Sequence, residues 1–226
     1  MKKITPAWLK NIKLIAWDLD GTLYPPMPII TNQIDQARFT TMAKHLQISF
    51  NEAKTKFRSM YARLHGTARV FNELGIDGEQ FFINFWKDFD LSKYIEPDPK
   101  LLKFFKQVQN RGIKHALLTN SNTNQSVQEK LTAVGLSSNL FVAIFTSSLT
   151  GIHKPMPEAF IQLWKQTSFE IDQIVYVGDK ENTDIIPAKK LGLKTVKMDW
   201  LSDSETTQAD LLVKTPIEFL KMFKIN

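Results

Sequence analysis

The sequence predicts an α/β protein with a doubly wound parallel sheet and an inserted helical domain. Short, continuous apolar runs recur along the chain, and each ends in a polar cluster, as buried parallel strands do. Segments with helical spacing of apolar residues separate the runs, which favours right-handed strand–helix–strand units. One long segment has helical patterns but no convincing strand, and proline-rich stretches border it.

The alternation of elements is regular outside that segment. The four apolar runs predict strands over residues 14–17, 113–118, 141–145 and 174–177, and residues 194–198 are predicted to form a fifth strand. The intervening patterns predict helices over residues 99–111, 124–134, 157–167 and 183–191. Gly135 and Gly192 follow the second and fourth of these helices, where glycine commonly ends a helix. A parallel sheet with helical crossovers accommodates all of these elements.

The irregular segment is predicted to be a separate domain. Its borders are Tyr24-Pro25-Pro26 on one side and Glu96-Pro97-Asp98-Pro99 on the other. An aromatic stripe within it recurs at helical spacing and is expected to be a core face, at residues 81, 82, 85, 86 and 89. The predicted organisation is therefore a core of residues 1–23 and 97–226, interrupted by helical residues 24–96.

Composition excludes several function classes. The chain has 226 residues, 43% of them hydrophobic and none cysteine, so a globular protein without disulfides, thiol nucleophiles or cysteine-bound metal is expected. The formal charge of +6 would suit nucleic acid, an anionic membrane or a small anionic substrate, but the basic residues are spread along the chain. The longest apolar run, 140–145, falls far short of the ~20 residues that cross a bilayer. We expect a cytoplasmic protein that binds neither nucleic acid nor membrane.

Two acidic residues that could act in catalysis or metal binding follow the first predicted strand. Asp18 and Asp20 lie in the run Asp-Leu-Asp-Gly-Thr-Leu directly after it. An isolated Asp-Gly is commonly a hairpin turn. Alternatively, two carboxylates at the carboxyl end of a parallel strand supply a nucleophile and a proton donor, or a set of metal ligands.

Three further motifs follow later strands or precede a helix. Thr119 and Asn120 come after the second strand, Lys154 precedes a helix, and Asp179 and Asp184 follow the fourth strand. Each has an ordinary interpretation as a helix cap or a surface residue. A hydroxyl beside backbone N–H groups at a helix N-terminus is equally a phosphate site. Because all of them lie at or just beyond strand ends, their combination favours catalysis.

These motifs, in this order, resemble the haloacid dehalogenase-like (HAD) hydrolase superfamily. The family pattern is DxDGT, an apolar strand ending in Thr or Ser, a Lys, then GDxxxxD, and it spans nearly the whole chain. The resemblance implies a Rossmann-like core with a helical cap inserted after the first motif. Residues 18–25, 65–67, 95–99 and 118–120 are similar to the pyrimidine 5′-nucleotidase-like branch, although that branch typically has Asn where this chain has Gly21.

The resemblance implies roles for the core residues. Asp18 would attack phosphorus and form an aspartyl-phosphate, while Asp20 would act as general acid and then base. Lys154 would neutralise the phosphate, whose oxygens Thr119 and the N–H of Asn120 would hold. A Mg²⁺ ion is the implied cofactor. Its implied ligands are the Asp18 carboxylate, the Asp20 main-chain carbonyl, Asp179 and, directly or through water, Asp184.

Substrate identity is less constrained by the sequence. Asp20 favours a phosphate ester, because dehalogenases of the superfamily generally lack this second aspartate. The branch resemblance implies a nucleoside 5′-monophosphate as the small-molecule partner, with His65, Thr67 and Arg69 as candidate cap contacts. A sugar-phosphate or phosphoglycolate phosphatase and a phosphomutase share the same motifs and remain alternatives. A non-catalytic binding module and a nucleic-acid-binding protein are the competing classes outside catalysis, and no oligomeric state is predicted.

Overall fold

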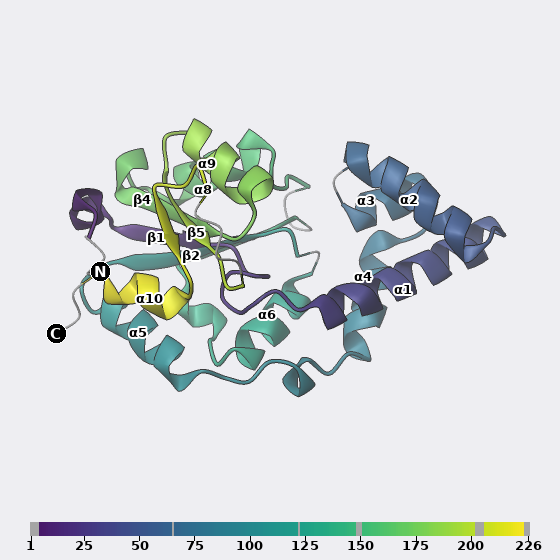
Figure 1. Cartoon of the computed structure of the whole chain (residues 1–226), viewed down its shortest axis with the longest axis horizontal. Coiled ribbons are helices and arrows are strands. Elements are labelled where there is room, and N and C mark those ends of the chain that lie inside the picture. The colour runs from purple at the N-terminus through teal and green to yellow at the C-terminus, as the bar shows by residue number, and fades with distance from the viewer. Residues whose placement is uncertain (1–4, 65, 122, 148–150, 202–205, 224–226) are drawn as a thin grey trace. The chain divides into compact units, whose positions relative to one another are not determined.

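The protein is described by a computed structural model that covers residues 5–64, 66–121, 123–147, 151–201 and 206–223 (Figure 1). The chain divides into two compact units. Unit 1 comprises Met1–Pro26 and Leu91–Asn226, and unit 2 comprises Met27–Asp90. Each unit is described by itself below.

Unit 1 is built on a six-stranded sheet in which every adjacent pair is parallel. The strand order is β3-β2-β1-β4-β5-β6. The strands are β1 (Leu14–Trp17), β2 (Lys114–Thr119), β3 (Ala143–Thr146), β4 (Ile174–Gly178), β5 (Lys194–Met198) and β6 (Leu211–Val213). The order reverses direction at β1, between β2 and β4. Open α/β sheets place ligands outside the carboxyl ends of strands at such a reversal.

Helices cover both faces of this sheet, which confirms the predicted doubly wound α/β class (Figure 1). The α-helices of unit 1 are α5 (Pro99–Gln109), α6 (Asn124–Ala133), α8 (Pro157–Thr167), α9 (Ile186–Lys190) and α10 (Pro216–Lys221). Successive residues of β1 point to opposite faces. Leu14 packs in a cluster with Phe160 of α8, whereas the ring of Trp17 lies 5.2 Å from that of Phe105 on α5. All four β1 residues are consequently buried.

The structure differs from the sequence prediction in several elements of unit 1, one of which is helix α10, which was not predicted. Strand β6 was not predicted, because it has only three residues and two of them are half-buried. Residues Ser138–Leu140 form a 3₁₀ turn, so β3 begins at Ala143 rather than at residue 141. The helix predicted over 183–191 is a π-helical turn, η5 (Glu181–Ile185), followed by α9. Pro187 has no N–H to continue the regular α-helical pattern across that junction.

Short 3₁₀ turns complete unit 1. They are η1 (Ala7–Asn11), η2 (Leu91–Lys93), η3 (Ser138–Leu140) and η4 (Ile171–Gln173). Residues at both ends of the predicted insertion contact the core: the turn η2 packs against α6, and the Tyr24 hydroxyl donates a hydrogen bond to Asp20. The boundaries between the units therefore fall at Pro26 and Leu91, inside the predicted segment 24–96. A cap role for unit 2 stays a prediction.

Unit 2 is helical. It contains α1 (Pro28–Leu46), α2 (Phe50–Leu64), α3 (Thr67–Glu73) and α4 (Gly78–Lys87). Phe39 of α1, Phe57 of α2 and Phe71 of α3 are buried together in its core. In the predicted aromatic stripe, Phe82 and Trp86 are buried and the other three rings are half-buried. Among the described residues of either unit, no helix combines the length and the apolar character that a bilayer crossing requires.

A buried histidine in the unit 1 core leads to a testable prediction of pH-dependent stability. His115 of β2 is fully buried, and its Nδ1 accepts a hydrogen bond from Trp17 Nε1 over 3.1 Å. Burial lowers the pKa of His115 from 6.5 to about 4, although its backbone partner, the carbonyl of Phe105, favours the protonated form. Between these two pH values the unfolded chain binds more protons than the folded one, so stability falls as the pH drops from 6.5 towards 4.

The expected contribution is about 1.4 kcal/mol for each pKa unit of difference. Urea unfolding across this pH range measures the slope in the wild type and in His115→Asn, which retains an acceptor near the position of Nδ1. We expect a smaller slope in the variant, whatever its stability at neutral pH. Identical slopes would mean that another group causes the pH dependence.

Candidate active site

The carboxyl ends of three neighbouring strands bring the predicted core motifs together. Asp18 directly follows β1, Thr119 is the last residue of β2, and Asp179 directly follows β4. These strands are adjacent in the sheet, with β1 between the other two. Asp18 and Thr119 are buried, although both are polar. The polar residues thus lie at the reversal of strand order, where a ligand is expected.

The loop after β1 separates the two predicted catalytic aspartates. The N–H of Asp18 still bonds to the carbonyl of Val177, over 2.8 Å, so this residue continues the sheet. The chain then turns, and Gly21 has φ +82, a conformation that favours glycine. A Cβ on Gly21 would lie 2.4 Å from Asp179 Oδ2. The glycine therefore permits the close approach of this loop to the loop that follows β4.

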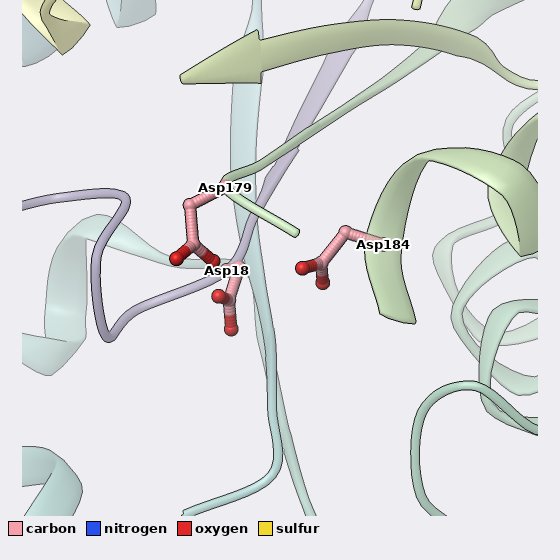
Figure 2. Close-up of side chains that lie close together, drawn as sticks. All are labelled: Asp18, Asp179 and Asp184. Atoms are coloured by element: carbon pink, nitrogen blue, oxygen red, sulfur yellow. The ribbon is translucent and has the colours of Figure 1, made fainter. Parts of the chain in front are cut away.

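Three carboxylates converge beside this loop. Figure 2 shows Asp18, Asp179 and Asp184 facing one another from separate segments, and one oxygen of each lies within 4.8 Å of the others. The π-helical turn η5 brings Asp184 into this cluster, because the N–H groups of Asp184 and Ile185 both bond to the carbonyl of Lys180. A Cβ on Gly178 would lie 2.5 Å from the Cβ of Asp184, so glycine is also needed there.

Lys154 is the buried cation of the cluster. Its Nζ donates to Asp18 Oδ1 and to Asp184 Oδ1, each over 2.6 Å, and to the Tyr176 hydroxyl over 2.9 Å. The Asn120 side chain fixes the lysine's backbone: its amide nitrogen donates to the Lys154 carbonyl and its oxygen accepts from the Lys154 N–H. The predicted residues Asp18, Asp184 and Lys154 are therefore in direct contact.

The cluster is short of positive charge. Burial raises the pKa of Asp18 to about 7; Lys154 opposes this increase, and Asp184 and Asp179 add to it. Burial likewise raises the pKa of Asp179. Although burial alone would lower the pKa of Lys154, the two carboxylates that it contacts raise it. Two of the acids contact the buried ammonium group, the third lies within 4.8 Å of them, and the three carboxylates repel one another in a poorly solvated site.

These residues fit a divalent cation such as Mg²⁺. Asp179 Oδ1 is buried and accepts no hydrogen bond from the described residues, while Lys180 Nζ lies 3.5 Å away. A set of carboxylate oxygens is the donor type that Mg²⁺ prefers. Asp18, Asp179 and Asp184 are the residues that could hold it. The Asp20 main-chain carbonyl stays a predicted ligand.

Asp20 has surroundings of its own. Its carboxylate accepts hydrogen bonds from Lys130 Nζ, the Ser121 hydroxyl and the Tyr24 hydroxyl. Burial would raise the pKa of Asp20, but Lys130 and the Tyr24 hydrogen bond outweigh this effect and lower it. The Asp20 side chain is nevertheless 43% exposed, whereas that of Lys130 is only 6% exposed. The protein thus contacts both oxygens of this carboxylate, although the side chain is partly exposed.

Two of the three predicted cap contacts lie among the described residues of unit 2. Thr67 begins α3 and is buried, and its hydroxyl accepts a hydrogen bond from Arg38 Nη1 over 3.3 Å. Arg69 Nη1 donates to the carbonyl of Leu64, also over 3.3 Å. His65 lies outside the described residues. A role in substrate recognition stays a prediction for all three.

Several site residues were not predicted from the sequence. Lys130 shares the buried side of α6 with Val127 and Leu131, and a lysine at a core-facing helical position was the available signal. Tyr176 is the one hydroxyl-bearing residue in the apolar run of β4. Trp200 donates from Nε1 to the Gly21 carbonyl over 3.0 Å. It lies just after β5, and nothing in its sequence context indicated this contact.

Comparison with known proteins identifies the family. The haloacid dehalogenase-like hydrolase family matches residues 12–192. The chain is 27% identical over 212 residues to the glyceraldehyde 3-phosphate phosphatase of Methanocaldococcus jannaschii, covering 83% of this chain and 85% of that protein. It is also 27% identical to the phosphoglycolate phosphatase of Haemophilus influenzae, covering 84% and 87% of the two chains.

A solved structure supports the same fold. The HAD phosphatase from Thermococcus onnurineus aligns with a TM-score of 0.70 at 22% identity, over 94% of this chain and 98% of that one. The family match covers the strands that carry Asp18, Thr119 and Asp179, together with the segments that carry Lys154 and Asp184. The chain belongs to the haloacid dehalogenase-like hydrolase family.

Proposed function

We propose that this protein is a phosphatase that hydrolyses a small phosphomonoester through an aspartyl-phosphate intermediate. The observation that carries the proposal is the contact of Asp18 with Lys154 inside a cluster of three carboxylates, at the strand ends where the family match lies. A buried carboxylate beside a buried ammonium group can attack an electrophile, because the ammonium group holds the carboxylate in place and offsets its charge.

In the first step, an Asp18 carboxylate oxygen attacks the phosphorus in line with the leaving oxygen. The new bond joins Asp18 to phosphorus, and the bond from phosphorus to the substrate oxygen breaks. Asp20 is the proposed donor of a proton to that oxygen, so that an alcohol departs rather than an alkoxide; because Lys130 and Tyr24 lower its pKa, it must take up this proton together with the substrate. The partly exposed carboxylate of Asp20 suits this contact with substrate.

In the second step, water hydrolyses the aspartyl-phosphate. Asp20, now ionised, accepts a proton from the attacking water, and the bond between Asp18 and phosphorus breaks. Inorganic phosphate leaves, Asp18 is a free carboxylate again, and Asp20 is protonated for the next turnover. The Thr119 hydroxyl and the Asn120 N–H are the proposed ligands of the phosphate oxygens.

The proposed cofactor is Mg²⁺, held by Asp18, Asp179 and Asp184. When bound, it supplies positive charge that lets an anionic nucleophile approach a phosphate dianion. The buried Oδ1 of Asp179, which accepts no hydrogen bond from the described residues, supports this assignment. Lys154 supplies a second positive charge beside Asp18.

The proposed substrates are small phosphorylated metabolites of the sugar-phosphate or phosphoglycolate type. Relatives that cover most of this chain are named for glyceraldehyde 3-phosphate and phosphoglycolate, which favours the alternative over the nucleotide suggested by the branch resemblance. This chain also has Gly21 where the nucleotidase-like branch typically has Asn.

Phosphate release from a substrate panel tests this proposal. The purified protein is incubated with Mg²⁺ and glyceraldehyde 3-phosphate, phosphoglycolate, UMP, CMP or p-nitrophenyl phosphate. We expect faster release from the first two compounds than from the nucleotides. Chelation of the metal should stop release, and added Mg²⁺ should restore it.

Other results would identify a different function. Preferred turnover of UMP or CMP would restore the nucleotidase assignment. Isomerised sugar phosphate without free phosphate would indicate a phosphomutase. No turnover of any of these compounds with Mg²⁺ would contradict the proposed phosphatase activity.

A further inference from the structure

Three side chains hold the Asp20 carboxylate: Lys130, Ser121 and Tyr24. Lys130 Nζ lies 2.8 Å from Oδ1 and 2.9 Å from Oδ2, so the ammonium group bridges both oxygens. The Ser121 hydroxyl donates to Oδ2 over 3.1 Å, and the Tyr24 hydroxyl donates to Oδ1. All four residues belong to unit 1. These contacts restrict rotation of a side chain that would otherwise turn freely where it is exposed.

Lys130 reaches Asp20 from a buried position. It lies on α6, with its side chain only 6% exposed, among the buried residues Val127 and Leu131. Burying an ammonium group is unfavourable unless it is paired and hydrogen-bonded. Its Nζ also donates to the Ser121 hydroxyl over 3.1 Å. The lysine and the serine therefore form a hydrogen-bonded pair that meets at Asp20 Oδ2, and the lysine also contacts Oδ1.

Hydrogen bonds connect Ser121, and through it Lys130, to Thr119, the residue proposed to bind phosphate. The N–H of Ser121 donates to Thr119 Oγ1 over 3.1 Å, and Thr119 Oγ1 donates to the Ser121 hydroxyl over 3.2 Å. A continuous path of hydrogen bonds therefore runs from Thr119 through Ser121 to Asp20. A phosphate oxygen that accepts the hydrogen bond of the Thr119 hydroxyl would break the bond from Thr119 to the Ser121 hydroxyl, which is the first in this path. The geometry at Thr119 and the orientation of Asp20 are thus physically linked.

We propose that Lys130, together with Ser121, is a positioning residue that holds the Asp20 carboxylate in the orientation in which it serves the leaving group. The inference rests on the proposed phosphatase function and adds two residues to it. Lys130 does not touch substrate in this proposal; it acts through Asp20. Proton transfer in a transition state depends strongly on geometry, so loss of this constraint should reduce turnover more than binding.

Two kinds of substrate separate positioning from a merely structural role. The p-nitrophenolate of p-nitrophenyl phosphate leaves with little need of protonation, whereas the leaving group of an alkyl phosphate needs a proton. In Lys130→Met we expect kcat to fall by about 10–100-fold for the best alkyl phosphate of the panel and by much less for p-nitrophenyl phosphate. KM should change little for either. Lys130→Arg should recover part of the loss, and Ser121→Ala should show a weaker form of the same pattern.

A matched control is available in unit 1. Lys189 of α9 also pairs with an aspartate, Asp210, over 3.1 Å, and is not among the site residues described above. Lys189→Met should leave both substrates unaffected. Thermal unfolding of each variant shows whether it is folded, and if Lys130→Met is not, then Lys130→Arg and Ser121→Ala decide the question.

Distinct results overturn the two proposals. Equal losses on both substrates, a change confined to KM, or wild-type rates in the folded variants would contradict positioning by Lys130 and Ser121. Absence of turnover in the wild type would instead contradict the phosphatase function.

Discussion

Substitution of Asp18 by asparagine is expected to abolish phosphate release, with a loss of at least ~10³-fold in kcat. Asp18 is almost completely buried and lies 2.6 Å from Lys154, so its carboxylate is already oriented. An amide of the same shape keeps the contact with Lys154 through its oxygen but is a poor nucleophile towards phosphorus. Steady-state phosphate release by the purified variant, with Mg²⁺ and the best substrate of the panel, measures the loss.

A second measurement tests the role of Asp18 directly. Rapid quenching of the wild type with substrate, followed by mass spectrometry of its peptides, should detect a phosphoryl group on Asp18 and none in Asp18→Asn. Asp210→Asn is a suitable control, because Asp210 pairs with Lys189 outside the site. Substantial turnover by a pure Asp18→Asn preparation would contradict the nucleophile assignment.

The sheet and the core motifs could be predicted because local patterns encode them. Strands buried on both faces read as unbroken apolar runs, and β1, which is such a run, has the predicted boundaries. Parallel strands with helical crossovers bring their carboxyl ends to one edge. Thr119 ends its strand and Asp179 directly follows its strand, so both reach the same edge as Asp18. Their positions at strand ends in the sequence were therefore sufficient to predict that these residues lie at one edge of the sheet.

Residues that act across long sequence separations could not be predicted in this way. Lys130 and Asp20 are 110 positions apart, and helical periodicity shows only that the lysine faces the core, not which acid it meets. Asn120 was expected to bind phosphate through its backbone N–H. Its side-chain amide in addition fixes the backbone of Lys154, 34 positions further along. Such pairings depend on how α6 and the segment before α8 pack on the sheet.

The π-helical turn shows a second limit. The sequence placed Asp184 near the start of a helix, and the structure places it within η5. The extra residue in the turn arises from two N–H groups that share the carbonyl of Lys180. Periodicity does not distinguish such a turn from an α-helix over so few residues. The turn nevertheless sets the position of Asp184 in the carboxylate cluster.

Substitution of Lys154 by methionine is expected to remove activity and also to destabilise unit 1, by roughly 3–5 kcal/mol in the absence of metal. The lysine side chain is only 2% exposed, and its ammonium group contacts Asp18 and Asp184, which are equally buried. Methionine fills most of the space but leaves two carboxylates without their cation. Because each is poorly solvated, their mutual repulsion and desolvation are no longer offset. Phosphate release should fall as well, since the charge beside the nucleophile is lost.

Urea unfolding with chelator and with Mg²⁺ separates these two effects of the Lys154 substitution. Added Mg²⁺ should restore part of the lost stability, because a cation held by the same carboxylates reduces their repulsion, but it should not restore turnover. The control Lys189→Met removes a more exposed ion pair and should cost less than about 1 kcal/mol. If Lys154→Met unfolds at the urea concentration of the wild type in chelator, the buried lysine does not stabilise the cluster. If it also turns over substrate normally, the cluster does not need a buried ammonium group for catalysis, and the charge that offsets Asp18 must come from elsewhere in the site.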